Sequence, residues 1–431
     1  MKRPSWCISN SIVLGLLIAG LLEGCSFPTG RVGTRNRAFI LYWPPPEESG
    51  KLRLAVKDLI DVKGFVTTAG SKYLDRRGTP ALRDAELLQR ARKQNVWIVG
   101  KTNLTEFGLG GSGMNEYYGT PRNRFITRRR LIPGGSSSGS AVAVAAGMAD
   151  VAFGTDTAGS VRVPAACCGI FGLKTTFGLV PLKGVFPISP KHLDTVGPLA
   201  TDISHLVDGM ELLQAGFREH YKKAIAANPS ARDITVGRLY MEGTDPAIDR
   251  SVDEALAATG FRVVKLNHAL KKRWEEAGQQ AQTLAVADAW LNHRQLLGQP
   301  GISPLTKAAI LLGEFEYRNN YWRAKLAQRA WKRTLRKVFR DVDFVALPTL
   351  NKVPPKVPFF GRSAAFEALI LKVENTEAVN LAGNPALAIP IPLHGNGARE
   401  TSLQLVGPPL SEAQLLNAGR LIEAKSEKAQ L

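Results

Sequence analysis

The stretches PGGSSSGS at residues 133–140 and GTDTAGSVR at residues 154–162 have the most unusual composition in the chain. Regular structure flanks both Gly/Ser turns, because small residues at 140–149 predict a helix and the apolar run 151–153 predicts a buried strand. A Gly/Ser-rich loop that opens a helix can hold a phosphate through its backbone N–H groups. The first loop lacks the Gly-Lys-Ser/Thr ending of a nucleotide-binding loop and does not match the dinucleotide fingerprint, so it does not indicate a nucleotide site.

On both sides of these turns, strand and helix patterns alternate. Strands are expected at 52–56, 96–99, 261–266, 343–347, 386–391 and 403–406. Helices are expected from a Thr79-Pro80 start through 82–91, at 203–216, 247–258 and about 268–340, and after the capping box Ser411-x-x-Gln414. This alternation is typical of an α/β fold.

Composition narrows the class of protein. With 431 residues, of which 44% are hydrophobic, the chain can bury a large core, which excludes a disordered or fibrous protein. Its formal charge of +19 favours anionic surroundings. Because we find no zinc-spaced Cys/His set, basic zipper or RNA-binding aromatic motif, we expect no nucleic-acid partner. A basic helix near 327–338 is interpreted as a solvated face or as a contact with an anionic membrane or wall.

The N-terminal segment, residues 1–24, has the pattern of an export signal. Lys2 and Arg3 precede an apolar run at 12–22 that is too short for a comfortable transmembrane span. The four residues LEGC that end at Cys25 resemble a bacterial lipoprotein cleavage box, although its glutamate stands where a small or apolar residue is usual. We therefore expect an exported protein, either periplasmic or anchored to the membrane by lipid on Cys25.

Three consecutive prolines lie within residues 25–49, which predicts an extended tether. The remaining residues, 50–431, are expected to form the folded domain. Two of the four cysteines, Cys167 and Cys168, are sequence neighbours, and we interpret them as buried fillers rather than as a disulfide or as metal ligands.

Serines in both turns suggest nucleophilic hydrolysis, which needs a base. Only six histidines are present, and His192 alone lies near either turn in sequence, so the pattern disfavours a Ser-His-Asp triad. A lysine can replace histidine if burial lowers its pKa from about 10.4 and leaves the amine neutral. Lys57 follows the apolar residues 54–56 and is the candidate base. The alternative is an ordinary surface lysine at the end of a strand.

An ordered series of motifs resembles that of the amidase signature family. The motifs are AVKD (55–58), TTAGS (67–71), GKTNxxEF (100–107), the Gly/Ser loop, TDTAGSxRxP (155–164), CGxxGLK (168–174), LDTVGP (193–198), NLAG (380–383) and LQLVGP (403–408). The resemblance covers roughly residues 50–425, and so many matches in one order make chance implausible. With the alternation of strands and helices, it leads us to expect a single α/β/α layered domain with a mixed, mostly parallel central sheet. It also implies hydrolysis of an amide C–N bond in a small-molecule substrate, without a metal or organic cofactor.

The resemblance assigns three catalytic side chains. Ser160 is the nucleophile that becomes acylated, Ser136 is the bridging serine, and Lys57 is the base that receives the proton relayed through Ser136. A cis peptide bond between Gly135 and Ser136 is also implied.

The same resemblance places the oxyanion hole at the backbone N–H groups of four consecutive residues, Thr157, Ala158, Gly159 and Ser160. Most members of the family have glycine at the position of Ala158, so this chain departs from the pattern there. Supporting roles are implied for Ser137, Asp156 and Arg162. The substrate entrance is expected at Gly110, Gly111 and Ser112, with an ordinary surface turn as the alternative.

Three functions therefore stay open. An amidase that acts through an acyl-enzyme on Ser160 is the first. The second is the glutaminase subunit of a tRNA-dependent amidotransferase, which needs cytoplasmic partners and which the export signal disfavours. The third is a non-catalytic envelope protein on an amidase scaffold, suggested only by Ala158 and the surface charge. The sequence does not indicate an oligomeric state.

Overall fold

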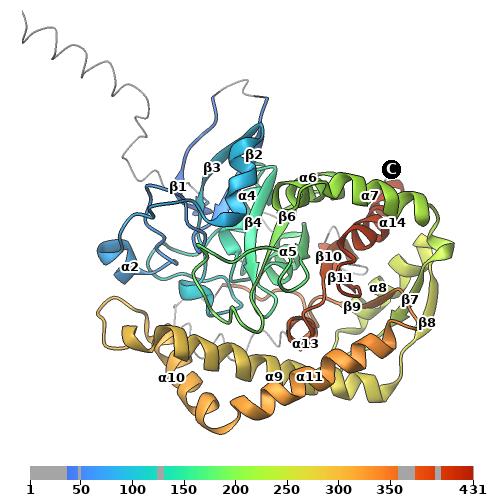
Figure 1. Cartoon of the computed structure of the whole chain (residues 1–431). Coiled ribbons are helices and arrows are strands. Elements are labelled where there is room, and N and C mark those ends of the chain that lie inside the picture. The colour runs from blue at the N-terminus through green and yellow to red at the C-terminus, as the bar shows by residue number, and fades with distance from the viewer. Residues whose placement is uncertain (1–35, 47–49, 124–130, 358–373, 394–398, 431) are drawn as a thin grey trace, which may run out of the picture. The chain divides into compact units, whose positions relative to one another are not determined.

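The computed structural model of the chain (Figure 1) describes residues 36–46, 50–123, 131–357, 374–393 and 399–430. All of them belong to the larger of two compact units, Gly33–Leu431, while the other unit is Met1–Val32. The predicted export signal and Cys25 lie outside the described residues, as does much of the predicted tether.

A large mixed sheet runs through the larger unit. Among the described residues it has 11 strands in the order β1-β3-β2-β4-β6-β5-β10-β11-β9-β7-β8. Their bounds are β1 Phe39–Tyr42, β2 Leu52–Lys57, β3 Val96–Thr102, β4 Val151–Asp156, β5 Phe171–Lys174, β6 Thr195–Ala200, β7 Thr235–Arg238, β8 Arg262–Lys265, β9 Phe344–Pro348, β10 Ala386–Leu393 and β11 Arg399–Val406. The predicted α/β class is confirmed, and each predicted strand overlaps an observed one.

Parallel order is confined to two groups of strands. β3, β2 and β4 are parallel neighbours, and so are β9, β7 and β8. The described strands between these groups, and β1 at the edge, pair antiparallel. The sheet is mixed, as predicted, and the expected mostly parallel order holds only within these two groups. Its middle is antiparallel in part because β10 and β11 follow each other closely in the chain, and a short connection joins only antiparallel neighbours.

Helices cover both faces of the sheet (Figure 1). One face packs against helices α3, α6, α7, α8 and α14, through an apolar core that includes Leu206, Phe217, Leu256 and Leu415. The bounds of these helices are α3 Gln89–Lys93, α6 Ile203–Leu213, α7 Phe217–Ala227, α8 Pro246–Thr259 and α14 Glu412–Gln430.

The other face packs against α4, α5, α9, α11 and α13. Alternate residues of β9 divide between the two cores: Phe344 and Ala346 face the first set of helices, and Val345 and Leu347 face the second. The bounds are α4 Ser138–Ala145, α5 Arg162–Cys168, α9 His268–His293, α11 Tyr321–Val338 and α13 Glu374–Ala382, with α10 Pro304–Asn319 packed on α9. The shorter elements are α2 Lys72–Arg77, η1 Glu86–Leu88, η2 Glu106–Gly108, η3 Ala231–Asp233 and η4 Arg294–Leu296.

Several local predictions were wrong. Residues 39–42 were assigned to the tether but form β1, because Phe39 and Ile40 are buried in the core. The helix expected from residue 82 starts only at η1 and α3, since Pro80 forms a β-bridge with Val66. In contrast, the predicted start of the last helix is confirmed, since α14 begins at Glu412, directly after Ser411, whose hydroxyl donates to the carbonyl of Pro408 at 2.7 Å.

Within the described part of the chain, no helix is both long enough and apolar enough to span a membrane.

Candidate active site

Lys57 is the last residue of β2 and is completely buried. Its amine donates to the hydroxyl of Ser136 at 2.7 Å and to the hydroxyl of Thr155, on β4, at 2.8 Å. Burial lowers the pKa of Lys57 to about 7, against the opposing effect of the negative charges of Asp156 and Asp194. A large fraction of the amine is therefore neutral near neutral pH and can accept a proton. The alternative interpretation of Lys57, an ordinary surface lysine at the end of a strand, is therefore wrong.

Ser136 and Ser137 lie in the loop immediately before α4, and both are completely buried. The peptide bond between Gly135 and Ser136 is cis, as the family resemblance implied. The neighbouring loop holds this segment through two backbone hydrogen bonds, from Gly135 N to Gly111 O at 2.6 Å and from Thr105 N to Ser136 O at 3.2 Å.

Ser160 lies in the turn that joins β4 to α5, and it is partly exposed, unlike the buried Lys57 and Ser136. The backbone N–H of Ser137 donates to the carbonyl of Ser160 at 3.3 Å, which ties the two serine-bearing turns together. The side chain of Ser137 donates to the carbonyl of Thr155 at 3.3 Å. The structure thus brings the end of β2, which carries Lys57, together with the turns that carry Ser136 and Ser160, and of these three residues only Ser160 is open to the outside.

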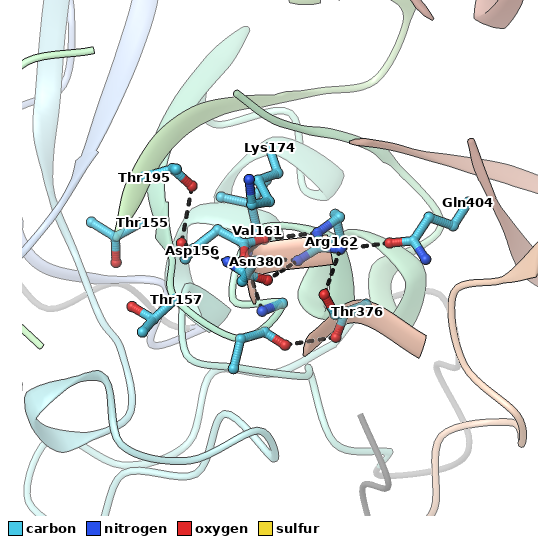
Figure 2. Close-up of polar contacts among 12 residues, drawn as sticks. Thr155, Asp156, Thr157, Val161, Arg162, Lys174, Thr195, Thr376, Asn380 and Gln404 are labelled. Carbon is cyan, nitrogen blue, oxygen red and sulfur yellow. Dashed lines mark hydrogen bonds and ion pairs between the residues drawn. The ribbon is translucent and has the colours of Figure 1, made fainter. Parts of the chain in front are cut away.

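The carboxylate of Asp156 shapes the turn between β4 and α5 (Figure 2). It accepts hydrogen bonds from the backbone N–H groups of Gly159 at 2.9 Å and Val161 at 3.1 Å. Burial alone would raise the pKa of Asp156, but the charge and hydrogen bonds of Arg162 outweigh burial and hold that pKa below its usual range. Asp156 therefore stays ionised and fixes the turn.

Arg162 connects this turn to the C-terminal part of the chain (Figure 2). Besides its two hydrogen bonds to Asp156, it donates to the side chain of Gln404 at 2.6 Å, the side chain of Asn380 at 2.5 Å and the carbonyl of Thr376 at 3.1 Å. Asn380 in turn donates to the Asp156 carboxylate at 2.8 Å. The bracing contact predicted for Asp156 and Arg162 is present, and it extends to α13 and β11.

The predicted oxyanion donors are not equivalent in the structure. The N–H of Gly159 is bonded to Asp156, so in this conformation it cannot also point at a substrate oxygen. The hydroxyl of Thr376 donates to the carbonyl of Ala158 at 2.6 Å and so fixes the orientation of the Ala158–Gly159 peptide. This geometry removes Gly159 from the predicted set of donors and leaves the N–H groups of Thr157, Ala158 and Ser160.

A second buried carboxylate holds the start of the turn. The hydroxyl of Thr157 donates to Asp194 at 2.7 Å, and Asp194 also accepts the N–H groups of Ile188 and Ser189, each at 2.9 Å. Burial raises the pKa of Asp194, and these hydrogen bonds only partly offset that effect.

The predicted entrance residues occupy the loop after η2. Gly110 and Gly111 are partly exposed, whereas Ser112 is completely buried. The carbonyl of Gly111 accepts the N–H of Gly135, and the hydroxyl of Ser112 accepts the N–H of Met114 at 3.1 Å. The Gly111 contact joins the loop to the Ser136 segment, and the Ser112 contact lies within the loop itself.

Sequence reasoning assigned no role to five residues that complete the site. They are Thr155, Asp194, Thr376, Asn380 and Gln404. Four of them belong to motifs that carry the family resemblance, so the sequence marked these residues but did not indicate what each of them does. Thr376 lies just before the NLAG motif, and no pattern in the sequence distinguished it.

Among the described residues, no group of three or more His, Cys, Asp or Glu side chains comes together as a metal site. Cys167 and Cys168 are free and buried, and burial raises the pKa of both thiols.

Comparisons with known proteins agree on one group of relatives. A family model described as Amidase matches residues 52–416. The A-type subunit of glutamyl-tRNA(Gln) amidotransferase from Natronomonas pharaonis is 33% identical over 419 residues, which cover 87% of this chain and 96% of that protein. The 2-amino-5-chloromuconic acid deaminase of Comamonas testosteroni is 34% identical over 384 residues, 86% of this chain and 81% of the deaminase. Among solved structures, the A-type subunit of the Thermotoga maritima amidotransferase aligns with a TM-score of 0.74 at 25% identity, covering 92% of this chain and 89% of the other.

Proposed function

This chain belongs to the amidase family and hydrolyses amide C–N bonds, and we propose that it does so through an acyl-enzyme on Ser160, with Ser136 and Lys57 as the proton relay. The observation that carries this proposal is the 2.7 Å hydrogen bond between the fully buried Lys57 amine and Ser136. A buried lysine with a pKa of about 7 is suited to general-base catalysis near neutral pH.

In the first half of the reaction, the Oγ atom of Ser160 attacks the carbonyl carbon of the amide. The proton of Ser160 passes to the hydroxyl of Ser136, whose own proton passes to the neutral amine of Lys57. The substrate oxygen becomes negative and is stabilised by backbone N–H groups of the Thr157–Ser160 turn, with Gly159 excepted.

The tetrahedral intermediate then collapses and breaks the C–N bond. Lys57 returns its proton through Ser136 to the departing nitrogen, which leaves as an amine or as ammonia. Water attacks the ester on Ser160 with the same relay as base, and the carboxylic acid is released.

The proposal is tested with a fluorophosphonate probe, which reacts with activated serines, followed by peptide mass spectrometry. We expect one modified residue, Ser160, and no labelling of Ser160→Ala. Ser251→Ala is the matched control, because Ser251 is buried on α8 and donates to Ala247 at 2.9 Å. A screen of aryl, fatty, peptide and small carboxamides then defines the substrate. Unlabelled wild-type protein that hydrolyses none of these amides would support the non-catalytic alternative.

A second candidate function is the glutaminase subunit of a tRNA-dependent amidotransferase. It is favoured by the 33% identity over 96% of the Natronomonas protein. The two functions separate in one assay, the release of ammonia from glutamine by the purified chain. Hydrolysis of glutamine in preference to the other amides, increased by amidotransferase partner subunits, would favour the second candidate.

We further propose that the chain is exported and carries lipid on Cys25. The support is the sequence pattern alone: Lys2, Arg3, the apolar run 12–22 and Cys25. Radiolabelled palmitate should enter the wild-type chain in a bacterial host and should not enter Cys25→Ala. Wild-type protein released in soluble form without label would refute the anchor.

A further inference from the structure

Helices α10 and α11 are joined at Asn320, follow one another along α9, and both carry exposed apolar side chains. Five large hydrophobic side chains on them are each between 51% and 72% exposed: Leu311, Leu312 and Phe315 on α10, and Trp322 and Leu326 on α11. In Figure 1 the two helices, coloured gold to orange, lie along the lower edge of the view. We call these five residues the apolar patch.

The patch follows the spacing of a helix face. Along α10 the exposed positions 304, 308, 311, 312 and 315 are Pro, Ala, Leu, Leu and Phe, and only the last two exposed positions, Arg318 and Asn319, are polar; Thr306, Ile310 and Gly313 are buried. A surface helix normally turns its apolar stripe toward the core and its polar stripe toward water. α10 has a second apolar stripe on the outside, which indicates a surface that another apolar phase covers.

Positive charge adjoins the patch. α11 has the sequence YWRAKLAQRAWKRTLRKV, with seven Lys and Arg residues and no Asp or Glu. Its buried residues include Trp331 and Leu335, so its inner face packs on the protein, and the basic side chains cover the outside. The ammonium group of Lys325 lies 4.4 Å from the centre of the Trp322 ring, which places a cation beside the most exposed member of the patch.

We propose that the apolar patch is a docking surface for an anionic lipid membrane. Exposed Leu, Phe and Trp side chains insert at the boundary between headgroups and acyl chains, and adjacent Lys and Arg side chains bind the anionic headgroups. A second copy of this chain fits the surface less well, because a two-fold contact would place one strongly basic α11 beside another. This docking surface is distinct from lipid on Cys25 and does not depend on the catalytic mechanism.

The test uses the full chain and vesicles of phosphatidylcholine with and without phosphatidylglycerol. Sedimentation with vesicles should require phosphatidylglycerol and should weaken as salt is added. The triple variant Leu311→Gln/Leu312→Gln/Phe315→Gln should bind about tenfold more weakly or worse. Arg329→Gln/Arg333→Gln should lose the preference for the anionic lipid. The matched control, Leu82→Gln/Val264→Gln, removes exposed apolar side chains elsewhere and should bind like the wild type.

A local readout separates the patch from any contribution of the N-terminal segment. Brominated lipids should quench part of the tryptophan fluorescence of the wild type, and Trp322→Phe should abolish that part. Thermal unfolding and hydrolysis of a soluble amide verify that the variants are folded. Equal vesicle binding by the triple variant and the control, with no quenching of Trp322, would overturn the proposal. Concentration-dependent dimers that the triple variant abolishes, without vesicle binding, would assign the patch to a second copy of the chain and would also overturn it.

Discussion

Arg162 donates two hydrogen bonds to the carboxylate of Asp156, from Nε to Oδ2 at 3.0 Å and from Nη2 to Oδ1 at 2.9 Å, and both side chains are completely buried. The same carboxylate binds the backbone of the turn that carries Ser160. One ion pair therefore neutralises two buried charges and fixes the shape of the turn.

Replacement of Asp156 by Asn should destabilise the fold by about 3–5 kcal/mol, because Arg162 then stays buried without its counter-charge. Urea unfolding measures the change. Asp84→Asn is the matched control, since Asp84 pairs with the largely exposed Arg92 at 2.9 Å, and its effect should stay below about 1 kcal/mol. Similar losses in the two variants would contradict the importance of the buried pair.

Gly159→Ala should reduce kcat by about 10²-fold or more, the usual cost of a disturbed oxyanion hole. The backbone φ of Gly159 is +132°, and a Cβ atom there would overlap the hydroxyl of Thr376. Gly147→Ala is the control: its φ is +68°, but nothing lies within 4 Å of its Cβ position. Steady-state kinetics should show that Gly147→Ala keeps its activity, and full activity of Gly159→Ala would refute the structural argument.

The rate should rise with pH through about 7, because only the neutral form of Lys57 accepts a proton and its lowered pKa is about 7. Below that pH, kcat/KM should increase about tenfold per unit, and above it the rate should level off. Lys174 is also buried with a pKa of about 7, so the Lys174→Met variant is measured in parallel. If the midpoint disappears in Lys174→Met, the titrating group is Lys174 and not Lys57, and the prediction is contradicted.

Thr155→Val should lower the midpoint of that pH profile and also its plateau. The Thr155 hydroxyl accepts a hydrogen bond from the Lys57 amine at 2.8 Å, so it stabilises the protonated form and helps to orient the base. Thr259→Val is the control, because the hydroxyl of Thr259 donates to Ala255 at 2.7 Å on α8. A midpoint that moves upward would show that Thr155 does not stabilise the charged lysine.

The three proposed catalytic residues should differ in their effects. Ser160→Ala removes the acylated atom, so turnover and probe labelling should both vanish. Ser136→Ala and Lys57→Ala leave that atom in place, and each should reduce kcat by about 10²- to 10⁴-fold. The double variant should be little worse than the poorer single one, because the two side chains form one relay. Ser137→Ala should be milder. Active Ser160→Ala, or full additivity of the two relay losses, would reject the mechanism.

Local patterns predicted most strands and helices, because burial along one stretch of chain leaves its mark on the residues of that stretch. The run before Lys57 identified both β2 and the lysine at its end. The same reasoning missed β1, although residues 38–43 (AFILYW) form a continuous apolar run typical of a buried strand; the run lies in the segment assigned to the tether, and its place beside β3 depends on a partner about 60 residues away. The antiparallel middle of the sheet was missed for a similar reason. Whether two strands pair parallel or antiparallel depends on how distant segments of the chain come together in the fold, and not on the residues of either strand alone.

The two Gly/Ser turns and Lys57 were recognisable in the sequence because their residue types are set by chemistry within a few positions. The surroundings of the site were not. Arg162 contacts Gln404, 242 residues away, and Thr376 holds Ala158 from 218 residues away. The hydrogen bond from the Gly159 N–H to Asp156 likewise depends on how the turn is folded and could not be predicted from the sequence. Side-chain type limits which hydrogen bonds a residue can form, but the folded backbone selects among them, since a hydrogen bond forms only where donor and acceptor meet at about 3 Å.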